Sequence, residues 1–343
     1  MNRQHFLFQS VAILVSLCSI STVAIAEPLP AAVATSSVSE IKRSIALPSP
    51  SIESIANFGE GMSRCKGKIF LNRASQNYFS ALLPADYVAE TASTGATNLW
   101  FYIPENRMAK AEFSLGANDD ASGAIMHFQE LNNVDGKNGL LKITIPPNTI
   151  RPNTSYWWDL ALVLDDVDRS ADVYMFGSIN QQSLEQVSLD KSPAALALLT
   201  DVLSNPTSIL SLDESKAQAL ATALQTSLDS ETISMAESQL REYFISRHDD
   251  YGQLTQVIAE LAQDSRTNAA ELEEFEQKHS QMLLELAQVS AFFELWGDTA
   301  NYLAMARATH PEEWQSLLEV LFLEKQGADA EGMISVLTTA QDF

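Results

Sequence analysis

Four aspartates lie close together in the stretch SYWWDLALVLDDVDRSADVYMFG, which runs from Ser155 to Gly177. Calcium prefers oxygen ligands, so these carboxylates could bind it. The spacing does not fit an EF-hand loop, because no glycine stands at its sixth position and no glutamate at its twelfth. A solvated hairpin end, with Arg169 as a partial counter-charge, is the favoured alternative. The four candidate ligands are Asp165, Asp166, Asp168 and Asp172.

Two adjacent tryptophans, Trp157 and Trp158, precede the aspartates. Neighbouring side chains of a strand point to opposite faces, so one indole is expected in the core and the other on the outer face or under another element. An exposed indole could stack on a sugar ring. Aromatic bulk more often serves packing, so a pair divided between core and interface is the favoured alternative.

Apolar side chains recur at alternating steps of three and four in the C-terminal half of the chain. This pattern, sustained over about three and a half heptads, predicts a helix that packs lengthwise on another helix, within the chain or from a second copy. His279 lies in the pattern, and a titrating group there could make pairing depend on pH. The predicted helical seam comprises Leu272, Phe275, His279, Met282, Leu286, Val289, Phe293 and Trp296.

Sequence motifs of known chemistry are missing. The chain has no H-E-x-x-H, C-x-x-C, G-x-S-x-G, G-x-x-x-x-G-K or G-x-G-x-x-G. We therefore expect no catalytic residue, no cofactor and no resident metal, and a protein that is not an enzyme. An unrecognised hydrolase remains an alternative, and it would need two carboxylates about 5 to 10 Å apart in a cleft.

The first part of the folded chain is expected to be a β-structure. Between Cys65 and Ile179, short segments alternate polar and apolar residues and are separated by turn-forming residues. Such spacing predicts an immunoglobulin-like antiparallel β-sandwich. The expected strands are 66–71, 78–83, 98–103, 110–115, 124–131, 139–145, 155–164 and 172–179.

A helical period replaces the alternation after Gln182. Ser192 and Pro193 suit the N-cap and first position of a helix. Segments 298–308 and 311–326 would form a hairpin like one tetratricopeptide unit, although no 34-residue repeat recurs. The helix that begins at Pro193 is expected to end at Asn205, because Pro206 follows. Other helices are expected at 213–228, 230–246, 251–263 and 328–340. The fold class is therefore α+β, with a β-sandwich domain at 63–182 and an acidic helical domain at 190–343.

The N-terminus resembles an export signal. Arg3 precedes an apolar stretch that ends in Ala24-Ile25-Ala26, so residues 1–26 are expected to be a cleaved signal peptide, with an uncleaved anchor as the alternative. Residues 27–62 are a linker rich in Pro, Ala and Ser. Cleavage would leave Cys65 as the only cysteine, so no internal disulfide is expected. We expect a periplasmic, cell-envelope or extracellular location.

The charge is strongly negative. The chain has 44 acidic and 21 basic residues, for a formal net charge of -23, and residues 191–343 alone hold 25 acidic and 8 basic residues. Nucleic acids and anionic membrane surfaces both need a basic face, so neither is an expected partner. A protein partner or self-association through the helical seam is expected, and a glycan is the alternative ligand.

Several segments resemble a family of exported cyanobacterial proteins known only as domain of unknown function 928. They are the stretch NLWFYIPENRMAKAEFSL, the stretch LLKITIPPNTIRPNTSYWWDLALVLDDVDRSADVYMFGSI and the helical end FFELWGDTANYLAMARATHPEEWQSLLEVL. The resemblance implies that Arg169-Ser170-Ala171-Asp172 belongs to a recurring hairpin whose geometry Arg169 and Asp172 fix by charged hydrogen bonds. It implies no reaction. The sequence therefore favours an exported binding or protein-interaction protein over a carbohydrate-binding sandwich or a hydrolase.

Overall fold

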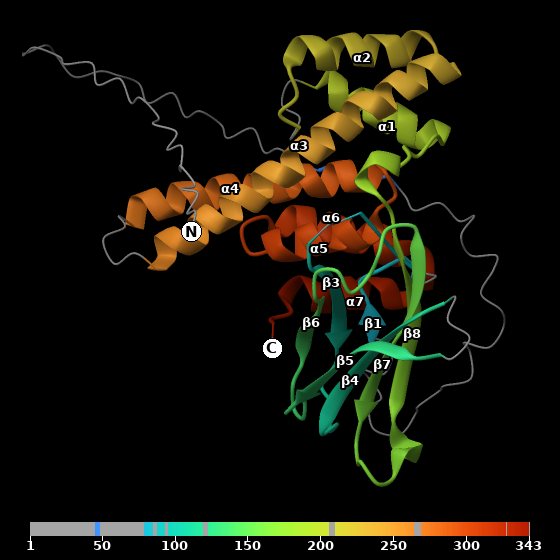
Figure 1. Ribbon diagram of the computed structural model, residues 1–343, viewed down its shortest axis with the longest axis vertical. Coiled ribbons are helices and arrows are strands. Elements are labelled where there is room, and N and C mark those ends of the chain that lie inside the picture. Colours follow the sequence, from blue (N-terminus) through green and yellow to red (C-terminus); the bar gives the residue numbers. More distant parts are fainter. Residues whose placement is uncertain are drawn as a thin grey trace, which may run out of the picture. The chain divides into compact units, whose positions relative to one another are not determined.

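A computed structural model describes residues 45–48, 79–84, 88–92, 95–118, 123–205, 210–263, 269–326 and 328–342. Residues Lys42–Phe343 form one compact unit. A β-region is followed by a helical region, which confirms the α+β class (Figure 1). The expected signal peptide, strand 66–71 and Cys65 lie outside the described residues, as does most of the linker, and the boundaries expected for the domains remain predictions.

Two sheets form the β-region. One has the strand order β1-β3-β6 and the other β2-β8-β7-β4-β5. Phe101 of the small sheet contacts Phe113 and Trp158 of the large sheet, with Phe101 and Trp158 edge to face at 5.3 Å between ring centroids. The two sheets are therefore the halves of a β-sandwich. The strands are β1 (Ser80–Ala81), β2 (Val88–Thr91), β3 (Thr97–Ile103), β4 (Lys110–Ala117), β5 (Ile125–Asn132), β6 (Gly139–Ile145), β7 (Thr154–Val163) and β8 (Val173–Gln181).

One strand departs from the antiparallel expectation. β2, which the sequence pattern did not predict, pairs with β8 in parallel, with Val88 opposite Ser178 and Glu90 opposite Asn180. A four-residue strand is too short for alternation to be recognised. The pairing is held on one face by the Asn180 amide, which donates to the Glu90 carboxylate at 2.6 Å.

Strand β3 is buried on both faces. Its sequence TNLWFYI is a nearly continuous apolar segment, as expected for a strand covered on both sides. Phe101 belongs to the hydrophobic core between the sheets, whereas Trp100 and Tyr102 belong to the core shared with the helices. The small sheet is therefore the middle layer between the large sheet and the helices.

The helical region begins where the sequence predicted. The Ser192 side chain accepts a hydrogen bond from the Ala195 amide, with Pro193 as the first helical residue, and Asp213 caps the next helix in the same way. These two helices are α1 (Pro193–Ser204) and α2 (Glu214–Thr226), and they are followed by α3 (Ser230–Gln263), α4 (Ala269–Phe292), α5 (Trp296–Ala306), α6 (Pro311–Gln326) and α7 (Ala328–Thr339).

Helix α3 corrects one expectation. The sequence predicted two helices separated by a turn at His248, but a single helix of 34 residues runs through this position. The polar residues there lie on a helix with no proline, so nothing breaks its hydrogen bonds. The helix packs lengthwise on α4, as Figure 1 shows.

Helix α4 ends earlier than expected. The predicted seam extends to Trp296, but α4 ends at Phe292 and Glu294 adopts a left-handed φ of 55° before α5 begins at Trp296. Gly297 is inside α5, where an added Cβ would lie 2.9 Å from the Glu90 carbonyl oxygen. Glycine is therefore required because α5 lies directly against β2.

Hydrogen bonds join α5 to the sheets. The Asp298 side chain is 3% exposed and accepts from the Thr91 hydroxyl at 2.6 Å and from the Ala92 amide at 2.7 Å. The Trp100 indole donates to the Asn301 side-chain oxygen at 3.2 Å. These bonds fix the helical region against the sandwich. Among the described residues, no helix combines the length and apolar character needed to cross a bilayer.

Candidate functional site

The outer face of the large sheet carries apolar side chains that reach solvent. Phe128 is 50% exposed, Phe176 41%, Met126 45% and Ile125 57%. Tyr174 stacks on Phe176, with ring centroids 6.0 Å apart and an angle of 9° between the rings. We call this surface the outer-face patch; it comprises Ile125, Met126, Phe128, Trp157, Tyr174 and Phe176.

Strand register explains why these side chains share one surface. Phe128 of β5 is opposite Ser114 of β4, Ser114 is opposite Asp159 of β7, and Asp159 is opposite Phe176 of β8. Four neighbouring strands about 4.8 Å apart place the outer two roughly 14 Å from each other. Two aromatic side chains therefore flank a centre made of a hydroxyl and a carboxyl group.

Asp159 is the titratable group at the centre of the patch. Burial raises the pKa of its carboxyl group, and the nearby charge of Glu112 adds to the rise, although a hydrogen bond with the Ser114 side chain opposes it. A carboxyl group at this position can accept hydrogen bonds from a polar ligand.

The tryptophan pair is divided as the sequence predicted. Trp158 is fully buried and its indole donates to the Ser178 carbonyl oxygen at 3.1 Å. Trp157 lies on the outer face, half-buried, and its ring covers Gly116 so closely that an added Cβ would come within 2.4 Å of it. A residue larger than glycine at position 116 would displace the indole.

Strand β5 is an edge of the large sheet. Among the described residues it pairs with β4 alone, and the register shifts between Leu115 and Gly116 near the start of β5. An edge strand presents unpaired backbone N–H and C=O groups. Natural edges are usually protected by charged side chains, proline, β-bulges or covering elements. β5 has no lysine or proline, so its protection is limited to Glu130 and to the register irregularity near its start. It is a surface on which another strand could pair.

An ion-pair network borders the patch. Lys110 Nζ lies 2.9 Å from Glu112, 2.8 Å from Glu130 and 2.7 Å from Asp166, and Arg169 pairs with Glu112 at 2.8 Å. Burial alone would raise the pKa of Glu112, but the hydrogen bonds from Lys110 and Arg169 outweigh it and lower that pKa. Glu112 therefore stays ionised.

The four candidate calcium ligands have separate roles. Asp165 accepts from the Val167 amide at 2.7 Å, and Asp168 caps a short 3-10 turn by accepting from the Ser170 amide at 3.0 Å. The buried Asp172 accepts from the Arg169 guanidinium, the contact that the family resemblance implied. Across the described residues, no group of three or more His, Cys, Asp or Glu side chains is arranged to hold a metal ion. The four carboxylates do not converge on one point.

The helical seam faces into the chain over its C-terminal half. Leu286, Val289, Phe293 and Trp296 belong to the core of the helical region, and Met282 is also buried. Its N-terminal half is partly exposed and contains the residues Leu272, Phe275 and His279. Phe293 and Trp296 lie beyond the end of α4, so the seam is not one continuous helix face.

His279 packs against α3. Its ring stacks on Tyr251 with centroids 4.8 Å apart, and its Nε2 lies 3.2 Å from the Thr255 hydroxyl. Burial lowers its pKa, and Glu276 opposes that shift. The imidazole is therefore neutral near pH 7, where it serves packing between two helices of one chain.

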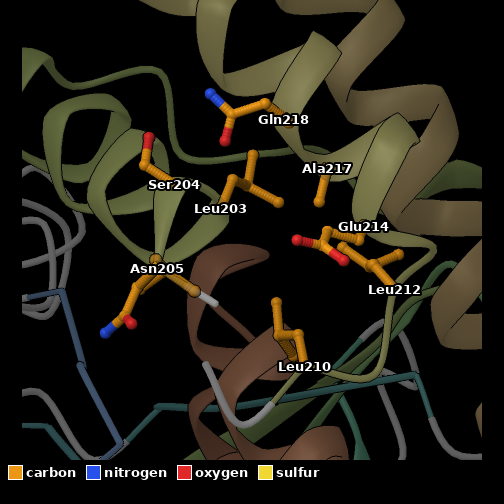
Figure 2. Close-up of a pocket in the computed structure, with 9 residues that line it drawn as sticks. Leu203, Ser204, Asn205, Leu210, Leu212, Glu214, Ala217 and Gln218 are labelled. Carbon is orange, nitrogen blue, oxygen red and sulfur yellow. The ribbon is translucent and has the colours of Figure 1, made fainter. Parts of the chain in front are cut away.

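A cavity of about 420 Å³ lies between α1 and α2 (Figure 2). Leu203, Leu210 and Leu212 line it, and Glu214 is its only acidic lining residue. A second cavity, of about 240 Å³, is lined by both Asp213 and Glu242. A hydrogen bond with Ser215 lowers the pKa of Asp213, which is opposite to what a general acid requires.

The sequence pattern predicts a strand at 124–131, which the structure confirms as β5, but the pattern does not indicate that this strand is an edge of its sheet. The signal that could have revealed the edge is the apolar side chain at Phe128, in register with the polar positions Glu130 and Asn132. Large apolar groups on the polar face of a strand indicate a binding surface.

Residues 61–199 match the family model described as Domain of Unknown Function (DUF928), the family that the sequence motifs resemble. The matched region includes both sheets and the first part of α1. No curated protein matches the chain significantly. A cryo-EM structure of the native conformation of E. coli alpha-2-macroglobulin is similar over 76% of this chain and 24% of its own, with 11% identity and a TM-score of 0.17. This chain therefore spans about a quarter of that protein, and the similarity is too low to assign a fold.

Proposed function

We propose that this protein is an exported, non-enzymatic binding protein of the periplasm or cell envelope. We further propose that it binds a protein partner through β5, which accepts an extended segment of the partner as an additional strand. The observation that carries this proposal is the open edge of β5 together with its exposed Phe128.

Main-chain hydrogen bonds between β5 and an added strand would supply affinity that depends little on the partner's sequence. Phe128 and Met126 would then supply selectivity, because burying a large apolar side chain contributes about 1.5 to 3 kcal/mol. The edge strand carries a single acidic side chain, Glu130, which pairs with Lys110, so the negative charge of the whole chain does not prevent approach of a neutral partner segment.

The test compares Phe128→Lys with wild-type protein in cross-linking and co-purification from the native envelope fraction. Lysine on an edge strand opposes strand addition, so the same partner should be captured by wild type and lost from the variant. Val167→Lys is the matched control, because Val167 is 93% exposed and lies outside the patch. Equal capture by Phe128→Lys and wild type would overturn the proposal.

A glycan is the second candidate ligand. Trp157 and the stacked Tyr174 and Phe176 offer aromatic surface beside the Asp159 carboxyl group, a combination that suits the apolar face and hydroxyl groups of a sugar. Envelope glycans should then quench tryptophan fluorescence in wild type and not in Trp157→Ala. Quenching that survives this substitution would exclude the patch as a glycan site.

A further inference from the structure

A short segment far from the patch is docked into the helical region. Residues 45–48, with the sequence Ile-Ala-Leu-Pro, fall within the predicted linker, where a free spacer was expected. Ile45 is only 6% exposed and belongs to the hydrophobic core of the helices. Ala46 and Leu47 pack against the same core and Pro48 is buried.

One buried side chain recognises the main chain of this segment. The Gln288 amide nitrogen donates to the Ala46 carbonyl oxygen at 3.2 Å, and Gln288 is 1% exposed. Among the described residues, its side-chain oxygen has no hydrogen-bond partner. Leaving a buried polar atom unpaired costs about 1 to 3 kcal/mol. An amide presents both a donor and an acceptor, so Gln288 can bind the C=O and an N–H of an extended backbone.

The surroundings of Gln288 define the chemistry of its ligand. It lies in α4, and three of the residues one helical turn from it, Leu284, Ala291 and Phe292, belong to the hydrophobic core, while the fourth is the buried Glu285. Ile45 and Leu47 flank a small residue, and Pro48 biases Leu47 toward an extended backbone. A segment that fits would therefore be extended, with two aliphatic side chains around a small residue and a proline after them.

We propose that the helical region contains a binding site for an extended aliphatic peptide, with Gln288 as its main-chain clamp and residues 45–48 as its built-in occupant. The site is separate from β5 and does not rest on the proposed function. Its occupant ties the predicted linker to α4, so the linker is a tether attached to the folded part at Ile45. Release of the occupant would free the site for a segment of the same chemistry.

The test uses the mature chain and a fluorescently labelled peptide with the sequence RSIALPSP, measured by fluorescence anisotropy. Ile45→Asp places a charge in an apolar site and should expel the chain's own segment. The peptide should then bind this variant at least about tenfold more tightly than wild type, whose site is occupied. In the Ile45→Asp background, Gln288→Leu should weaken peptide binding by about tenfold, a change equivalent to one lost hydrogen bond.

Two controls decide the result. A peptide with aspartate in place of its isoleucine and leucine should not bind. Ile45→Ala is a milder change that keeps the helices folded, and this variant, like Ile45→Asp, should bind the peptide more tightly than wild type does. Equal peptide binding by wild type and both variants, or none by either variant while circular dichroism shows intact helices, would overturn the inference. Neither outcome affects capture through β5.

Discussion

Asp159 is the residue at which stability and binding are expected to conflict. Its carboxyl pKa is raised by burial, so its stabilising contribution is complete below the unfolded pKa and is lost as the pH rises through the folded pKa. Asp159→Asn should therefore raise the thermal midpoint at neutral pH and change little well below the ordinary aspartate pKa of about 3.9. Thermal unfolding followed by circular dichroism at both pH values measures this.

Asp168 is the control, because its pKa is shifted in the opposite direction from that of Asp159. Hydrogen bonds from Ser170 lower its pKa, so its contribution is present above the unfolded pKa and is lost as the pH falls through the folded value. Asp168→Ala should lower the midpoint at neutral pH and lose that effect in acid. If both substitutions shifted stability in the same direction at neutral pH, the assignment of Asp159 as a penalised charge would be wrong.

For single residues, the sequence predicted which face of a strand a side chain occupies better than which partners it contacts. The opposite placement of Trp157 and Trp158 followed from strand geometry alone. The partners of the four aspartates did not, because Lys110 and Glu112 lie far away in the sequence and reach the loop only through the pairing of β4 with β7. Long-range pairing decides which charges meet.

Among the elements, α4 shows what periodicity can and cannot predict. The apolar pattern correctly indicated a long helix packed on another helix, and α3 is that neighbour. The pattern did not predict that polar residues of α4 are buried as well, and Glu285 and Gln288 both are. Glu285 is held by Arg247 at 2.8 Å and by the Tyr243 hydroxyl at 2.7 Å, and burial together with its charge raises the pKa of Tyr243 to about 12.

Replacement of a buried seam residue should therefore affect stability and leave assembly unchanged. Leu286 is fully buried, and Leu286→Ala should cost about 2 to 5 kcal/mol in the free energy of unfolding. Leu272→Ala, at the half-buried end of the seam, should cost less. Denaturant unfolding and light scattering measure the two quantities, and a change of assembly with unchanged stability would instead support the seam as an interface between copies.

For the whole molecule, the sheets and helices should unfold together. Trp100 and Tyr102 belong to the helical core, and Asp298 binds two groups at the end of β2. Asp298→Ala removes the acceptor of the buried Ala92 amide, which should cost about 1 to 3 kcal/mol. Tryptophan fluorescence and far-ultraviolet circular dichroism should give coincident transitions in wild type and separate transitions in the variant.

Asp298→Asn is the milder comparison, since it keeps one side-chain oxygen as an acceptor. Its midpoint should lie between those of wild type and Asp298→Ala. Two separate transitions already present in the wild-type protein would show that the sandwich and the helices are independent, and that the contacts of α5 do not couple them.

The most direct test of the proposed function is amide hydrogen exchange in β5, with and without the cross-linked partner. We expect the β5 amides that do not bond to β4 to exchange fast in the free protein and slowly in the complex, because an added strand would satisfy them. A stable complex in which β5 exchange is unchanged, while protection appears elsewhere, would contradict the account and move the binding surface away from this edge.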